Sequence, residues 1–174
     1  GIIAIKLAPY DLLVSASLVN AGDTVAVVSA KGQSIRFKES DAREMGRGAA
    51  GVRLIKLGKG DAVVSALVAR KGVAKPLLLV VSANGYGKRT KLSEYKTQHR
   101  GGSGIKTVKV TEKTGKLIVA RVVTSENEEL LAVSKESQVI RTELKSIPTL
   151  GRDTQGVRIM KLREKDCVAS FNLL

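Results

Sequence analysis

Residues 98–110 read QHRGGSGIKTVKV, an arginine and three glycines followed by a short segment that carries two lysines. The same frame recurs at residues 47–57 (RGAAGVRLIKL) and 152–162 (RDTQGVRIMKL), and the chain begins with a fourth copy, GIIAIKL. Steps of 50, 53 and 52 residues separate the glycines that open the copies, which are Gly1, Gly51, Gly104 and Gly156. A repeat of this length determines the architecture before any local pattern does.

Each repeat reads as four short strands. In the first repeat we expect strands at residues 12–19, 24–29, 34–38 and 52–57, with a tight turn at 30–33 and room for one helical turn at 39–45. Four strands per unit are typical of a propeller blade, and such blades must stack on one another to bury both faces. The sequence therefore predicts one all-β, propeller-like domain over residues 1–174, with repeat units at about 8–57, 58–110 and 111–162 and partial units at 1–7 and 163–174.

The segment that follows each glycine, here called the lysine strand, does not alternate as a regular strand would. Counted from the glycine, positions one, four and six are apolar in nearly every copy, position two is cationic in three copies, and position five is always lysine. Strict alternation would place positions two and four on the same face. We therefore expect a bulge or bend early in the segment, which would aim two basic side chains per repeat away from the core.

The charge of the chain favours an anionic partner. Lys and Arg number 30 against 16 Asp and Glu, a formal charge of +14, for which nucleic acid is the leading candidate and mere solubility the alternative. An anionic membrane surface is a poorer match, because the cations lie in strand-like segments and not on an amphipathic helix. The longest apolar run, residues 77–81, is too short to span a bilayer. The single cysteine, Cys167, excludes an internal disulfide and fits a cytoplasmic setting, and a start inside a repeat suggests a piece of a longer chain.

No motif indicates catalysis. Residues 46–51 match G-x-G-x-x-G, but a polar connection precedes them and a strand follows, whereas a dinucleotide site needs a strand before and a helix after. His99 is the only histidine, which excludes a histidine-based metal site, and it leaves no Ser-His-Asp or Cys-His set to propose. We expect no catalytic residue, metal site or cofactor in this chain.

Cations recur in register around the repeats. One arginine follows each hairpin turn, another precedes each strand glycine by four residues, and the lysine strand adds its two cations. Stacked repeats would align these positions along one rim, which would neutralise phosphates with little reading of bases. The predicted DNA-binding residues are Arg36, Lys38, Arg47, Arg53, Lys56, Lys88, Arg89, Lys91, Lys96, Gln98, Arg100, Gly101, Gly102, Lys106, Lys109, Arg141, Arg152, Arg158 and Lys161.

The middle repeat is the most basic, and we expect the strongest grip on DNA there. Its three glycines, Gly101, Gly102 and Gly104, would let a phosphate approach backbone N–H groups.

Three stretches closely resemble the C-terminal domain of the DNA gyrase A subunit: SAKGQSIRFKESDAREMGRGAAGVRLIKLGKGDAVVSALV, SANGYGKRTKLSEY and GRDTQGVRIMKL. The resemblance implies a six-bladed β-pinwheel with strands exchanged between blades, of which this chain would supply three full repeats and partial ones. In that family a basic outer rim wraps double-stranded DNA. The family's Q-[RK]-R-G-G-[RK]-G box is matched by Gln98, Arg100, Gly101, Gly102 and Gly104, whereas His99 and Ser103 replace cations, so this copy is box-like only.

The resemblance also implies a parent complex. It would be a bacterial, cytoplasmic and nucleoid-associated type II topoisomerase, in which the rest of the gyrase A subunit and the gyrase B subunit supply the catalytic tyrosine, ATP and Mg, and wrapping supports negative supercoiling. The C-terminal domain of the topoisomerase IV A subunit is the nearest alternative. A propeller used for protein–protein contact is an alternative of another class, against which the register of the cations counts.

Overall fold

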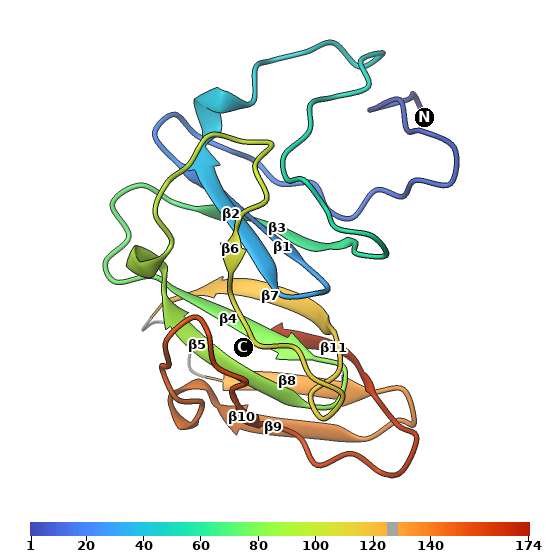
Figure 1. Cartoon of the computed structure of the whole chain (residues 1–174), viewed down its shortest axis with the longest axis vertical. Helices are drawn as coiled ribbons and strands as arrows, with labels where there is room; N and C mark the ends of the chain where they lie inside the picture. The colour runs from blue at the N-terminus through green and yellow to red at the C-terminus, as the bar shows by residue number, and fades with distance from the viewer. Residues whose placement is uncertain (125–128) are drawn as a thin grey trace.

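The computed structural model describes residues 1–124 and 129–174, and in these ranges eleven strands form three antiparallel sheets (Figure 1). The first sheet has the order β3-β1-β2-β6, with strands Val63–Ala69, Thr24–Ser29, Gln33–Lys38 and Ile105–Lys106. The second has the order β10-β5-β4-β7, with strands Val157–Arg158, Tyr86–Lys91, Leu77–Ser82 and Leu117–Val123. The third has the order β11-β8-β9, with strands Val168–Leu173, Glu129–Ser134 and Val139–Glu143.

A single turn of 3-10 helix follows the second strand of each hairpin. These turns are η1 (Glu39–Asp41), η2 (Leu92–Glu94) and η3 (Leu144–Ser146). The all-β, blade-like fold predicted from the sequence is confirmed, including a helical turn within residues 39–45. None of the helices in the described ranges is long and apolar enough to cross a membrane. Residues 125–128 of the predicted unit 111–162 lie outside the described ranges, and the predicted unit boundaries stay a prediction.

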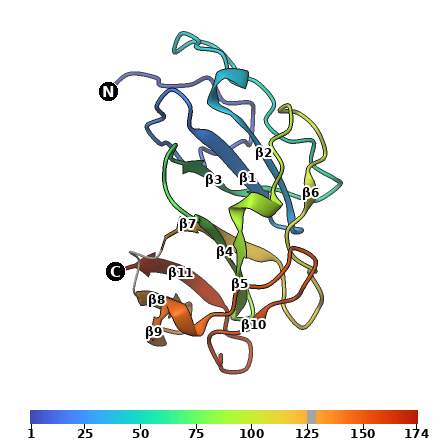
Figure 2. The ribbon, with the colours of Figure 1, turned by 90° about the vertical axis from the view of Figure 1, so that its left-hand side faces the viewer.

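Each sheet borrows strands from later repeats. The hairpin β1-β2 pairs with β3, which follows the η1 connection, and with β6, which lies beyond the next hairpin. The second sheet repeats this pattern with β7 and β10. Strands β3, β7 and β11 contact one another in sequence, so the sheets meet along these strands, and β6 and β10 form the opposite, outer edge (Figures 1 and 2).

Two predicted strands are wrong. Residues 12–19 and 52–57 have no strand ladder, although their counterparts in later repeats form β3 and β6. The counterparts pair with a hairpin that precedes them in the chain, and in the described structure no hairpin precedes residue 12. Backbone groups of an extended segment need such a partner to form a ladder. Residues 12–19 therefore expose Leu12, Leu13, Val14, Leu18 and Val19.

The core lies between the stacked sheets. Strand β4 is buried over five successive residues because the first sheet covers one face and the third sheet covers the other: Leu78 and Val80 join one apolar cluster, and Leu79 and Val81 join the next. Strand β8, in contrast, alternates between buried and half-buried residues. A strand covered on both faces carries a continuous apolar run, and LLLVVS in β4 is such a run.

Acidic side chains from one repeat hold the hairpin turn of the preceding repeat. The Asp61 carboxylate accepts hydrogen bonds from the amides of Lys31 and Ala62, both at 2.9 Å. Asp166 similarly accepts from the amides of Glu136 and Cys167, at 3.0 and 2.7 Å. Burial alone would raise the pKa of Asp166, but its hydrogen bonds with Ser134 and these amides lower the pKa below its ordinary value. The repeated acids thus have a structural role.

One glycine carbonyl in each of the first two hairpin turns accepts two successive amides from a lysine strand. The Gly32 oxygen accepts from Thr107 and Val108 at 2.8 and 3.4 Å, and the Gly85 oxygen accepts from Ile159 and Met160 at 2.8 and 3.1 Å. Two residues opposite one is the arrangement of a β-bulge. This is the irregularity that the spacing of cations predicts, and it lets the lysine strand lie directly against the turn.

Lys88 is the unusual member of the core, because its side chain is fully buried. Its ammonium donates to the carbonyls of Gly151 and Arg152 at 2.5 and 2.6 Å and to the Thr154 hydroxyl at 2.9 Å. Burial lowers the pKa of Lys88 to about 8, and the carboxylates of Glu94 and Asp153 only partly offset this effect. The residue is therefore still charged at neutral pH, with protein acceptors in place of water.

Gly32→Ala should destabilise the domain strongly. Gly32 has a φ of +83°, and a Cβ added there would lie 2.6 Å from the Val108 carbonyl oxygen and 2.9 Å from a Val108 methyl carbon. Strain at positive φ together with overpacking should lower the free energy of unfolding by about 2–4 kcal/mol, measured by urea denaturation.

Gly72→Ala is the matched control, because Gly72 also has a φ of +83° but a Cβ there would meet no atom within 4 Å. We expect a loss of about 1 kcal/mol from backbone strain alone. Equal losses of unfolding free energy in the two variants would mean that the close approach of the lysine strand does not limit the size of the residue at position 32.

Lys88→Ile should change how stability depends on pH. The pKa of Lys88 is about 8 in the folded protein, against about 10.4 for an unperturbed lysine. Between these values the unfolded chain binds more protons, so stability of the unsubstituted protein should rise with pH, by up to about 3 kcal/mol. Urea unfolding from pH 8 to 10 should show this rise relative to the variant, and a pH-independent difference between the two would contradict the burial of a charged ammonium.

Candidate nucleic-acid interface

The lysine strands present two cations per repeat at the outer edge of the sheets. At position four, Ile55, Val108 and Met160 are buried in successive apolar clusters. Positions two and five are exposed in all three copies, as the sequence predicts, and they flank a bulge in the copies at residues 105–110 and 157–162. The six exposed side chains are Arg53 and Lys56 in residues 52–57, Lys106 and Lys109 in residues 105–110, and Arg158 and Lys161 in residues 157–162. These three segments are called the first, second and third lysine strands.

Loops from the following repeat connect these lysine strands. In the first loop, the Gly101 amide donates to the Leu54 carbonyl at 2.7 Å, and the Gly102 carbonyl accepts from the Lys56 amide at 2.8 Å. In the second loop, the Thr154 carbonyl accepts from the Lys109 amide at 3.1 Å. Lysine strands and loops therefore alternate along one edge, and this assembly is here called the basic edge.

Two arginines of the loops also bind the preceding lysine strand. The Arg100 guanidinium donates to the carbonyls of Asp41 and Arg53 at 2.7 and 3.1 Å. Arg152 donates to the Lys106 carbonyl at 3.2 Å. Both side chains are half-buried at the basic edge, so they connect neighbouring repeats as well as adding charge.

The glycines of residues 98–104 have a packing role. The Gly101 N–H, expected to face a phosphate, donates instead to the Leu54 carbonyl. Gly104 has a φ of +72° and lies so close to the backbone of Ser34 that no side chain would fit. These glycines allow the loop to approach the first sheet, and the predicted anion nest is not formed at Gly101.

The arginines that follow the hairpin turns point between repeats. Arg36 donates to the Thr24 hydroxyl at 2.9 Å and to the Leu92 carbonyl at 3.2 Å, and Arg89 donates to the Ile147 carbonyl at 2.7 Å. Burial lowers the pKa of both guanidinium groups. Each thus holds the 3-10 turn of the next repeat.

Arg141 occupies the equivalent position in the third repeat, where it forms an ion pair with Glu129. Hydrogen bonding to this carboxylate raises the pKa of Arg141. Of the other predicted DNA-binding residues, Lys38, Arg47, Lys91, Lys96 and Gly102 are exposed and Gln98 is half-buried, whereas Lys88 is enclosed.

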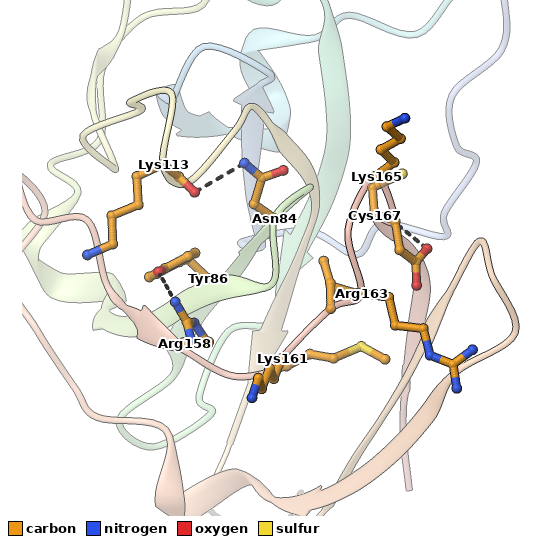
Figure 3. Close-up of a pocket in the computed structure, with 11 residues that line it drawn as sticks. Asn84, Tyr86, Lys113, Arg158, Lys161, Arg163, Lys165 and Cys167 are labelled. Carbon is orange, nitrogen blue, oxygen red and sulfur yellow. Dashed lines mark hydrogen bonds between the residues drawn. The ribbon is translucent and has the colours of Figure 1, made fainter.

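A basic hollow with a volume of about 630 Å³ lies where the lysine strand at residues 157–162 contacts the hairpin turn at Gly85 (Figure 3). The Arg158 guanidinium donates to the Tyr86 hydroxyl at 3.0 Å, and Arg158 and the Lys113 ammonium lie 5.6 and 5.5 Å from the Tyr86 ring centre. The hydrogen bond from Arg158 is the main cause of a lowered pKa at Tyr86. Five cationic side chains line the hollow: Lys113, Arg158, Lys161, Arg163 and Lys165.

Sequence reasoning missed three of these cations, Lys113, Arg163 and Lys165, as well as Tyr86. The available signal was the aromatic residue directly after the second hairpin glycine, where the other repeats carry Gln33 and Gln138. In the described residues, no three His, Cys, Asp or Glu side chains come together as metal ligands would. The cations of the basic edge and of the hollow suit this surface to anions.

The sequence of this chain matches a known protein family. The family described as DNA gyrase C-terminal domain, beta-propeller, matches residues 1–20, 23–70, 76–124 and 128–173. The DNA gyrase A subunit of Lawsonia intracellularis is 40% identical over 172 residues, which are 99% of this chain and 21% of that protein. The chain thus spans about a fifth of the length of this relative.

Two solved structures have the same fold. A DNA gyrase A C-terminal domain matches with a TM-score of 0.89 and 35% identity, over 99% of this chain and 58% of the other. The C-terminal domain of a DNA topoisomerase IV matches with the same TM-score but 21% identity, over 98% and 52% of the two chains. Since the family match covers nearly all of the residues, this chain belongs to the family of DNA gyrase C-terminal domains.

Proposed function

We propose that this chain binds double-stranded DNA along the basic edge and bends it around the stacked sheets. The observation that carries the proposal is the outward direction of two cations from each of three successive lysine strands, linked by hydrogen-bonded loops. Equivalent positions in stacked repeats lie in a row, and DNA offers a matching row of phosphates. Membership of the DNA gyrase C-terminal domain family supports the same function.

Binding by this edge is independent of base sequence. Lysine ammonium groups along the basic edge reach phosphates as point charges, whereas base reading needs an element placed inside a groove. The sheets meet along β3, β7 and β11, so a duplex that follows their outer edge must curve. Bending is costly for a stiff duplex, and each further phosphate contact offsets part of that cost.

The parent protein is a DNA gyrase A subunit under this proposal. Wrapping of DNA by this part would support negative supercoiling together with the gyrase B subunit, in the bacterial cytoplasm, with ATP and Mg bound in other domains. The chain alone would not catalyse a reaction. The higher identity to a gyrase A domain, 35% against 21% for topoisomerase IV, favours gyrase over its relative at equal fold similarity.

The affinity for a random-sequence duplex should fall steeply with salt, and fewer cations should flatten that dependence. We expect the triple variant Lys56→Gln, Lys109→Gln and Lys161→Gln to reduce the slope of log K against log salt by roughly 3, about one for each phosphate that is no longer neutralised. Fluorescence anisotropy at several salt concentrations measures this slope.

A control variant with the same change in charge is Lys71→Gln, Lys75→Gln and Lys145→Gln, at exposed positions outside the lysine strands. Its slope should stay close to that of the unsubstituted protein. Affinity that does not respond to salt would rule out the DNA proposal, and equal effects of the two triple variants would place the interface elsewhere.

Wrapping should also change DNA topology. If nicked circular DNA is sealed by ligase while the protein is bound, curvature of the duplex around the sheets should leave a linking-number change that grows with protein concentration. Gel electrophoresis of the deproteinised circles measures the change. Binding without any shift in linking number would mean that the protein holds DNA but does not wrap it.

A further inference from the structure

We propose that Lys88 is a positioning residue for DNA binding, which holds the loop at residues 151–154 and thereby orients the cations of the second lysine strand. The proposal deepens the DNA-binding function argued above and rests on it. Lys88 itself cannot reach a phosphate in this structure, because its side chain is fully buried. Its effect must therefore act through the loop.

The ammonium group of Lys88 gathers three acceptors from one short loop. Two are the consecutive carbonyls of Gly151 and Arg152, and the third is the hydroxyl of Thr154, all within 2.9 Å. The Thr154 hydroxyl also donates to the Gly151 carbonyl at 3.0 Å. A charged donor with three hydrogen bonds in a buried site restrains the loop more strongly than neutral contacts would.

The restrained loop is bonded in turn to the second lysine strand. The Thr154 carbonyl accepts from the Lys109 amide at 3.1 Å, and the Arg152 guanidinium donates to the Lys106 carbonyl at 3.2 Å. Asp153 forms an ion pair with the Lys106 ammonium at 3.4 Å. Three cations of the basic edge, Arg152, Lys106 and Lys109, are thus attached to the loop that Lys88 holds.

The other repeats have no ammonium at this position. Ile35 in β2 and Ile140 in β9 are the counterparts of Lys88, three residues after the hairpin turn. Ile35 lies beneath the first loop, where its Cδ1 would be 3.6 Å from a Cβ placed on Gly102. In the second loop Thr154 replaces Gly102, and the pair Lys88–Thr154 replaces an apolar contact with hydrogen bonds.

A double-mutant cycle tests whether Lys88 acts through the loop. Lys88→Ile introduces the residue found in the other two repeats, and Arg152→Ala removes one cation that the loop positions. We expect Arg152→Ala to weaken binding to a random-sequence duplex roughly fivefold in the unsubstituted protein but less than twofold with Lys88→Ile present, since coupled residues are not additive.

Arg53→Ala is the control for this cycle, because Arg53 has the position of Lys106 in the first lysine strand and is exposed. It should weaken binding by the same factor in both backgrounds. If Lys88 served overall stability only, Arg152→Ala would also have equal effects in both, and the proposal would be overturned. Lys88→Met, which keeps an unbranched chain, replaces Lys88→Ile if the latter does not fold.

Hydrogen exchange separates this proposal from the DNA-binding proposal. The Lys109 amide is bonded to the loop, so its exchange in the absence of DNA should be at least tenfold faster in Lys88→Ile, whereas the Lys56 amide, bonded to the first loop, should be unchanged. Unaltered exchange at Lys109 would overturn the role of Lys88. If the Lys109 amide exchanges faster in Lys88→Ile but the unsubstituted protein does not bind DNA, the role of Lys88 in restraining the loop stands and the DNA-binding proposal is rejected.

Discussion

The double hydrogen bond at the hairpin glycines is the interaction on which the rest of the structure depends. Because one carbonyl of Gly32 or Gly85 accepts two successive amides, the pleat of the lysine strand breaks between its second and fifth positions. The break places the apolar fourth residue in the core between sheets and turns the cations at positions two and five outward. A regular strand would bury one cation or expose the apolar residue. In the two lysine strands that bind a hairpin glycine, at residues 105–110 and 157–162, sheet assembly and the outward cations thus have the same local cause.

The cations of the chain have two distinct roles, which their chemistry explains. Arg36 and Arg89 use several N–H groups at once to bind carbonyls of the next repeat, as a planar guanidinium does well. The lysines at position five have a single mobile ammonium and no such carbonyl set, and they stay exposed. The repeated acids, Asp61 and Asp166, fasten turns. Part of the charged composition therefore stabilises contacts between repeats, and the lysine strands present six further cations outward.

The sequence predicted what depends on local pattern and missed what depends on partners. The hairpins, the helical turn after Lys38 and the bulge follow from turn residues and periodicity, and they are confirmed. Residues 12–19 have the composition of a strand, but a ladder needs a neighbour, which a local pattern cannot reveal. The regular spacing of the cations likewise could not show that Arg36 points between repeats or that Lys88 is buried. An exposed cation and a cation bonded to carbonyls can occupy the same position in a repeat. The hollow around Tyr86 joins distant segments and was missed for the same reason.

The repeats differ in how firmly the loops restrain the lysine strands that carry the cations. The first loop relies on glycines that let backbones approach, so Lys56 is fixed by its backbone amide while its side chain stays exposed. The second loop lacks Gly101 and Gly102 counterparts and is held instead by a buried ammonium, with Lys106 paired to Asp153. Fixing a cation before binding reduces the conformational entropy that is lost when a phosphate arrives. Under the proposed function, charge alone would therefore not rank the repeats, because restraint of the second lysine strand offsets part of the charge that Asp153 neutralises.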